Sequence, residues 1–297
     1  MVDIFKAVFL GFVQGITEFL PISSSGHLSL FQHFLGVGGD GSLLLSVMLH
    51  LGTLAAVFIV YYKDIWELVL EFGATVKDII HKEFSFKKMS PVRRMLVMFV
   101  ISCIPLLAVL IPVGGGELLI DKVKVFSEDT SILAEGICFM LTGVILISGS
   151  LRAKGLKNRG RAVNTPDAVV IGVAQTLAAL FPGISRSGST ISAGMLCGVS
   201  RQYMVKYSFI LGIPAILAAN VLEFKDAVES GATVSAGPVF AGIITAALVG
   251  TASIILLRWI LKKDLFKYFG YYCLAIGAVT LIIAIIEKAT GVYVGVK

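Results

Sequence analysis

The stretch AVFLGFVQGITEFLPISSSG, residues 7–26, decides how this chain is built. It begins as an apolar run, but Gln14 and Glu18 interrupt the run, Pro21 ends it, and a cluster of serines with a glycine follows. Helical backbone that stops inside a membrane exposes polar groups, which only surrounding protein or a water-filled cavity can satisfy. The stretch therefore predicts a helix that breaks within the membrane beside a polar site.

The same unit occurs a second time, as AVVIGVAQTLAALFPGISRSG at 168–188. At an offset of 161, the matched residues are Ala7, Val8, Gly11, Gln14 and Pro21 with Ala168, Val169, Gly172, Gln175 and Pro182. After one residue of slippage, Ser-x-Ser-Gly at 23–26 recurs at 185–188. Two such units that enter the membrane from opposite faces form an inverted-topology repeat, whose broken helices surround a site near the bilayer midplane.

The composition places the whole chain in the membrane. Of the 297 residues 57% are hydrophobic and only 15% are charged, whereas a soluble domain carries about 25% charged residues. The mean hydropathy is +0.91, and apolar runs of about 20 residues, long enough to cross a bilayer as helices, recur along the chain. The net charge of +6 is therefore interpreted as an orientation signal, and no nucleic-acid partner is expected.

We predict an all-α polytopic integral membrane protein that forms a single membrane domain, 1–297, with about ten helical segments. Six segments are long enough to span, at 42–62, 93–112, 132–151, 203–223, 236–257 and 267–286. Two broken re-entrant pairs complete the fold, one at 4–35 and the other at 167–198. The first repeat half is 1–151, and the second is 152–297.

The basic residues set the orientation of these segments. Of the 25 Lys and Arg, 17 lie in or beside four connections, at 63–94, 152–166, 199–202 and 258–267. Because basic connections face the cytoplasm, the alternation requires each re-entrant pair to enter and leave on one side. The pair at 4–35 then enters from outside and the pair at 167–198 from the cytoplasm, with both chain ends external.

The two breaks predict an anion site. After each break a helix restarts, and its first turn offers free N–H groups and the positive end of the helix dipole. Arg186 adds a planar guanidinium suited to bidentate contact with phosphate oxygens. Hydroxyl groups beside the two helix starts come from Ser23, Ser24, Ser25, Ser185, Ser187, Ser189 and Thr190. A phosphate group is the ligand that suits such a site best.

Glu18 turns the prediction from binding toward reaction. A carboxylate near the bilayer centre costs roughly 2.5–3.5 kcal/mol, and it repels a phosphate unless a cation lies between them. Gln14, four residues earlier, shares its helix face, so a divalent metal is one reading; a protonated Glu18 or a general base are the others. His27 follows Ser24 by three residues, which permits a hydroxyl nucleophile with a nearby imidazole.

Gln14 to His27, QGITEFLPISSSGH, and Pro182 to Thr190, PGISRSGST, resemble the two signature motifs of the undecaprenyl-diphosphate phosphatase (bacitracin resistance) family. The resemblance covers essentially the whole chain. It implies an integral membrane phosphoric anhydride hydrolase that converts undecaprenyl diphosphate to undecaprenyl phosphate and inorganic phosphate for cell-wall synthesis. It also implies a divalent cation, Mg²⁺ or Ca²⁺. Many members have glutamate at the position of Gln14, so here Glu18 carries the carboxylate role alone.

The resemblance assigns roles to individual residues. The catalytic residues are Glu18, Ser24, His27 and Arg186. Glu18 and Gln14 organise the metal. The phosphate-binding residues are Ser23, Ser25, Ser185, Arg186, Ser187 and Thr190. Ser24 is the nucleophile with His27 as its proton acceptor, although His27 as nucleophile and a metal-activated water remain open.

Partners and location also follow from the resemblance. The protein is expected in the bacterial cytoplasmic membrane, where bacitracin competes for the lipid substrate and does not bind the protein. Members are reported as dimers, which leaves a homodimer open. Because broken helices in inverted repeats are also a transporter design, a transporter or flippase for a lipid phosphate or other anion is the alternative. The type 2 phosphatidic acid phosphatases are excluded, since Ser192 occupies the position where their motif requires histidine.

Overall fold

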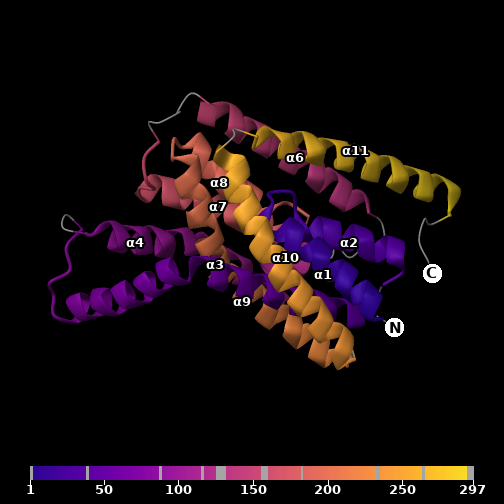
Figure 1. Cartoon of the computed structure of the whole chain (residues 1–297), viewed down its shortest axis with the longest axis horizontal. Coiled ribbons are helices and arrows are strands. Elements are labelled where there is room, and N and C mark those ends of the chain that lie inside the picture. Colours follow the sequence, from indigo (N-terminus) through magenta and orange to yellow (C-terminus); the bar gives the residue numbers. More distant parts are fainter. Residues whose placement is uncertain are drawn as a thin grey trace.

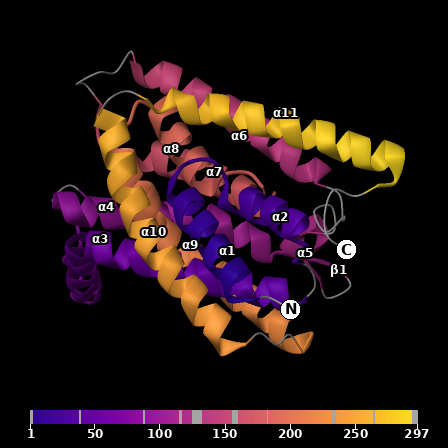
Figure 2. The same cartoon turned by 45° about the vertical axis from the view of Figure 1, so that its right-hand side comes forward.

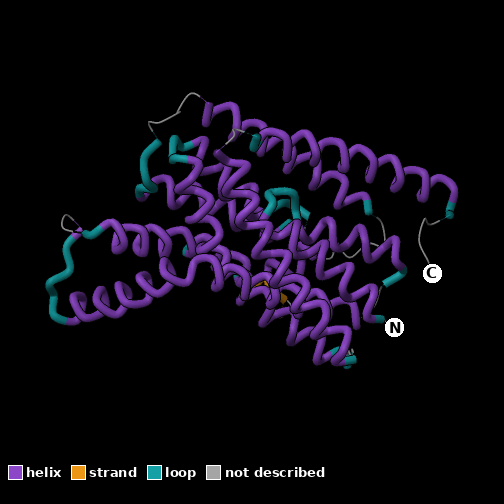
Figure 3. Tube along the Cα trace, in the orientation of Figure 1, coloured by secondary structure: helices purple, strands orange, loops and turns teal. Residues whose placement is uncertain are grey.

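The computed structural model describes residues 3–37, 40–86, 89–114, 117–124, 132–154, 160–181, 183–231, 235–262 and 265–292. Helices dominate these residues (Figure 3). In chain order the elements are α1 (Ile4–Phe19), α2 (Ser24–Leu35), α3 (Asp40–Ile80), α4 (Pro91–Cys103), the 3-10 helix η2 (Pro105–Leu110), β1 (Pro112–Gly114), β2 (Glu117–Leu118), α5 (Leu119–Lys124), α6 (Leu133–Lys154), α7 (Thr165–Leu180), α8 (Arg186–Leu196), α9 (Arg201–Glu229), α10 (Ala236–Lys262) and α11 (Lys267–Thr290). β1 and β2 form a small antiparallel hairpin.

The predicted membrane architecture is confirmed. Six helical segments of the described chain are long and apolar enough to cross a membrane: Gly41–Ile80, Pro91–Leu110, Leu133–Ala153, Arg201–Glu229, Ala236–Ile260 and Lys267–Thr290. α6 and α11 lie side by side along one edge of the molecule (Figures 1 and 2). α1 packs along α10, which also contacts α3. The start of α1 and the end of α11 lie on the right of Figure 1, opposite the hairpin of α3 and α4.

The prediction for the third helix was wrong in its extent. The expected span ended at 62 and a loop was expected to follow, but α3 continues to Ile80 with one non-helical residue, Tyr61. The charged residues after 62 ended the apolar signal without breaking the helix, because Lys and Glu are good helix formers. The added turns pack beside α4, where Arg93 pairs with Glu71 and Asp78.

The two re-entrant pairs match each other in position and in packing. α7 has the 16 residues of α1 and begins 161 positions later. A Cβ atom on Gly11 would lie 2.6 Å from the carbonyl oxygen of Gly242 in α10, and one on Gly172 would lie 2.5 Å from that of Ser102 in α4. The repeated glycine therefore lets each first helix touch a spanning helix of the other half. The division at 151 and 152 stays a prediction that this packing supports.

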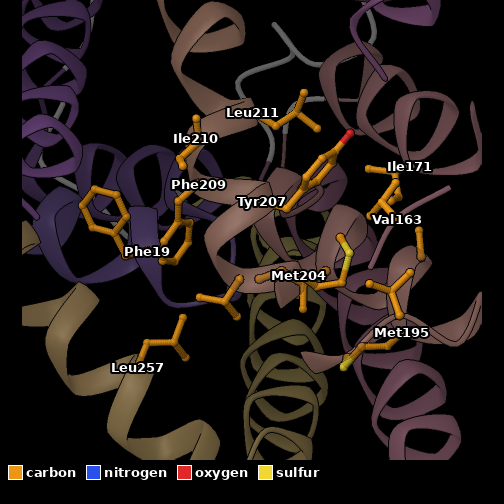
Figure 4. Packing of buried hydrophobic residues seen from close by; sticks show 14 of the residues in the cluster. Phe19, Val163, Ile171, Met195, Met204, Tyr207, Phe209, Ile210, Leu211 and Leu257 are labelled. Carbon is orange, nitrogen blue, oxygen red and sulfur yellow. The ribbon is translucent and has the colours of Figure 1, made fainter. Parts of the chain in front are cut away.

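The largest apolar core lies between α9 and the helices around it (Figure 4). Phe19 at the end of α1 meets Phe209 edge-on, with ring centroids 5.4 Å apart. On the other side of α9, Tyr207 donates or accepts a 2.8 Å hydrogen bond with Ser102. This core fixes α9 against both breaks and so holds one wall of the site.

Candidate active site

The two helix breaks are built alike. α1 ends at Phe19, and α2 restarts at Ser24 with Ser23 as its N-cap, whose Oγ accepts from the N–H of Gly26 at 3.2 Å. α8 restarts with Ser185 as N-cap, whose Oγ accepts from the N–H of Gly188 at 3.0 Å. Ser23 has φ 72°, a left-handed conformation that reverses the chain between α1 and α2. Pro182 lies outside the described residues.

The breaks touch, as the inverted repeat predicted. The N–H of Gly183 donates to Ser25 Oγ at 3.1 Å. Arg186, the first residue of α8, donates from Nη2 to Glu18 Oε1 at 2.7 Å. The amino-terminal ends of α2 and α8 therefore meet at one place, although the residues lie about 160 positions apart in the chain.

Glu18 is the centre of the polar contacts. Its side chain is buried, 6% exposed. Besides Arg186 on Oε1, its Oε2 accepts from Ser24 Oγ at 2.6 Å and from Gln14 Nε2 at 3.1 Å. His50 Nε2 lies 3.9 Å from the same oxygen. The short Ser24 contact places a hydroxyl proton against a carboxylate, which is the arrangement of a nucleophile and its base.

A cavity of about 160 Å³ opens beside this cluster. It is large enough for several waters or a phosphate group. Its titratable lining residues are Glu18, His50, Arg186 and Glu223. Two carboxylates and one guanidinium do not offset the charge of a diphosphate, so a ligand of that kind needs additional positive charge.

An apolar groove adjoins the polar cavity. The groove, about 550 Å³, lies between α6, α7 and α8 and is lined almost entirely by apolar side chains. Ala178 and Ile184 belong to the lining of both the groove and the cavity. A molecule with a charged head and an apolar tail can therefore occupy both at once.

His27 lies apart from the predicted nucleophile. It is buried, and its Nδ1 lies 2.7 Å from the carbonyl oxygen of Ser23. Its Nε2 lies 2.8 Å from the hydroxyl of Tyr272, and the two rings are stacked. Both ring nitrogens thus have partners other than Ser24, whose hydroxyl is directed to Glu18.

The predicted phosphate-binding hydroxyls fall into two groups. Ser24, Ser25, Ser185 and Ser187 line the cavity, together with Arg186. Ser23 is used as a helix cap, and Thr190 Oγ1 makes a 2.6 Å hydrogen bond with Ser208. Thr190 therefore braces the start of α8 against α9, while the lining serines remain close to any ligand.

The residues present fit a divalent cation only in part. Within the described ranges, no three His, Cys, Asp or Glu side chains gather to hold a metal ion. Glu18 offers a carboxylate, and Gln14 Oε1 is buried without a hydrogen-bond partner. Mg²⁺ is commonly bound by one or two carboxylates plus substrate phosphates, so these two oxygens suit a cation whose remaining ligands come from a bound phosphate.

Sequence reasoning missed three polar residues of the site. His50 comes from α3, and Asn220 and Glu223 come from the last third of α9. The available signal was their polarity within or at the end of predicted spans, since such residues in membrane helices mark functional sites by default. What the sequence did not give was their direction, which depends on how α3 and α9 are rotated.

The fold and site define a class: an all-α polytopic membrane protein with an amphiphile-sized site, in which hydroxyl, carboxylate and guanidinium groups meet at two helix N-termini. Comparison with known proteins gives the particular family. The chain belongs to the family described as Bacitracin resistance protein BacA, whose sequence pattern matches residues 7–279.

Named relatives cover nearly the whole chain. It is 36% identical over 289 residues to an undecaprenyl-diphosphatase of Methanosphaera stadtmanae, covering 96% of this chain and 100% of that protein. It is 38% identical over 285 residues to an undecaprenyl-diphosphatase of Halothermothrix orenii, covering 95% and 98%. A third undecaprenyl-diphosphatase, from Alkaliphilus metalliredigens, is 36% identical over 283 residues, covering 95% and 99%.

Proposed function

We propose that this protein hydrolyses undecaprenyl diphosphate to undecaprenyl phosphate and inorganic phosphate. The family and its named relatives support this activity. The observation that carries it in the structure is the contact between Ser24 Oγ and Glu18 Oε2 at 2.6 Å, beside Arg186 at the joined helix N-termini. A carrier of anions needs the cradle but not a hydroxyl held against a base, so this contact favours the phosphatase over the transporter or flippase.

The geometry supports a specific order of events. Arg186 and the free N–H groups of α2 and α8 hold the terminal phosphoryl group and stabilise the charge that develops on it. Ser24 Oγ attacks the terminal phosphorus while Glu18 accepts its proton. The bond to the bridging oxygen breaks, and undecaprenyl phosphate leaves. Water then hydrolyses the phosphoserine, with Glu18 as base again, and releases inorganic phosphate.

We also propose a divalent cation, Mg²⁺ or Ca²⁺, held by Glu18 and the amide oxygen of Gln14. Bound there, it would offset phosphate charge that Arg186 alone does not. The buried, unpartnered Gln14 Oε1 supports this assignment. For the other half of the substrate, the groove that adjoins the cavity at Ala178 and Ile184 suits the prenyl chain.

The orientation of the protein is a further part of the proposal. The basic connections place the hairpin of α3 and α4 in the cytoplasm of a bacterial cell and both chain ends outside. The cavity residues of α9 recur on one helix face from Ala215 to Glu223, about 12 Å along the helix. They lead toward the predicted external end of α9, so we expect the cavity to open outward. Modification of single engineered cysteines in intact cells tests this orientation.

Partners beyond the lipid follow the family. Bacitracin resistance would arise because the enzyme removes the diphosphate lipid for which the antibiotic competes, without bacitracin binding to the protein. The family also supports a homodimer, which size-exclusion chromatography with light scattering in detergent would test.

The direct test of the function uses detergent-purified protein with a C55 or C15 prenyl diphosphate, with and without EDTA. We expect phosphate release that EDTA abolishes and added Mg²⁺ or Ca²⁺ restores. Release of no phosphate under any of these conditions, with the protein folded, would favour the carrier.

A further inference from the structure

Two amide side chains line the cavity and have no role in the scheme above. Gln175 of α7 is fully buried, 0% exposed, and both Nε2 and Oε1 lack a hydrogen-bond partner. Asn220 of α9 is 6% exposed, and its Nδ2 also lacks a partner. Buried polar groups in native proteins nearly always have partners, so several unpartnered atoms around one cavity point to a ligand that supplies them.

The two amides complement the charged groups of the site. Glu18 and Arg186 already pair with each other, and Glu223 adds a second negative charge to the lining. Amide N–H groups donate hydrogen bonds to phosphate oxygens without adding positive charge that would bind inorganic phosphate too tightly for release. They come from α7 and α9, so they contact a ligand from walls that Ser24 of α2 does not share.

We infer that Gln175 and Asn220 form a neutral amide subsite that binds phosphoryl oxygens of the prenyl diphosphate. The inference rests on the proposed function. In it, Nε2 of Gln175 and Nδ2 of Asn220 donate to the diphosphate, and both are positioning residues that leave the proton transfer at Ser24 and Glu18 unchanged.

The test replaces each amide by an apolar side chain of similar size, Gln175→Met and Asn220→Leu. The first measurement is KM and kcat for farnesyl diphosphate. The second is the inhibition constant of farnesyl methylenediphosphonate, whose P–C–P bridge resists hydrolysis. We expect each variant to weaken inhibitor binding and lower kcat/KM by about 10- to 100-fold, as the loss of a hydrogen bond to a charged group does.

Thermal unfolding separates binding from structure. Replacing an unpartnered buried amide by an apolar group of the same shape is close to neutral or stabilising. The inference therefore predicts an unchanged or raised Tm in each variant. Ser192→Ala is the matched control: Ser192 Oγ is buried and unpartnered on α8 but does not line the cavity, so its removal should leave the inhibition constant at the wild-type value.

Three outcomes would overturn the inference: wild-type inhibitor binding in both variants, a Tm that falls together with activity, or an equal loss of inhibitor binding in Ser192→Ala. Should Gln175→Met fold poorly, Asn220→Leu on the other helix carries the test alone and must show the weakened binding. Failure of the proposed function is distinguishable, because the wild-type protein would then release no phosphate at all.

Discussion

Arg186 Nη2 lies 2.7 Å from Glu18 Oε1, which joins the second re-entrant pair to the first through a buried ion pair. Ser24 binds the other oxygen of the same carboxylate. Glu18 thus links the group that would hold the phosphate to the group that would attack it. An ion pair of this kind, away from bulk water, is costly to break by removing one partner.

Removing either partner of this ion pair should abolish catalysis. We expect Glu18→Gln and Arg186→Ala each to lower kcat/KM for a prenyl diphosphate by at least about 10²–10³-fold, because the base or the phosphate-holding charge is lost. Phosphate release by purified variants measures this effect. Arg93→Ala, at the α3–α4 hairpin away from the cavity, is the control and should retain activity; near-normal turnover in either site variant would remove that residue from the scheme.

The chemistry should leave its mark on Ser24 and not on His27. Ser24→Ala is expected to lower kcat by about 10³-fold or more, as loss of a nucleophile does. Tyr272→Phe removes only the hydroxyl that contacts His27 Nε2, and we expect it to stay within about tenfold of wild type, since that contact lies away from the Ser24–Glu18 pair.

Trapping the phospho-enzyme decides between the two residues. Rapid acid quench and mass spectrometry should locate phosphate on Ser24, because phosphoserine survives acid. An acid-labile phosphate on His27, or a mild effect of Ser24→Ala beside a severe effect of His27→Ala, would assign the nucleophile to His27.

Gly212 should matter only through Arg186. A Cβ atom at Gly212 would lie 2.2 Å from Arg186 Nη1. The guanidinium ends a flexible side chain, so Gly212→Ala should displace it while the helix remains folded. We expect activity to fall by about 10²-fold with a Tm within a few degrees of wild type. Gly73→Ala, in a helix with no atom near the added methyl, should keep full activity; equal activity in both variants would contradict the placement of Arg186.

A second carboxylate at position 14 should strengthen cation binding. Gln14→Glu places a negative charge beside Glu18, and cation affinity rises with the number of charged ligands. We expect the Mg²⁺ or Ca²⁺ concentration for half-maximal activity to fall by roughly tenfold, and the Tm to become more dependent on the cation. Gln32→Glu is the matched control, since Gln32 contacts Ser46 at a distance from the site. An unchanged cation requirement in Gln14→Glu would argue against a metal at this position.

Much of the architecture was predictable from local patterns. Apolar runs placed the six spanning helices, because burial in a bilayer depends on composition over about 20 residues. The repeated Ser-x-Ser-Gly placed both helix restarts, because an N-cap serine is a local interaction. The end of α3 was misjudged, since polarity ends a membrane span without ending a helix.

The sequence by itself determined that Glu18, Ser24 and Arg186 are polar groups at two breaks within an apolar chain. Only the tertiary structure decided which of them touch. It directed Ser24 to Glu18, turned His27 to Tyr272, and brought His50, Gln175 and Asn220 to the same cavity. The physical reason is that a break position depends on neighbouring residues, whereas the direction of each side chain depends on how helices from both halves rotate to fill their shared core.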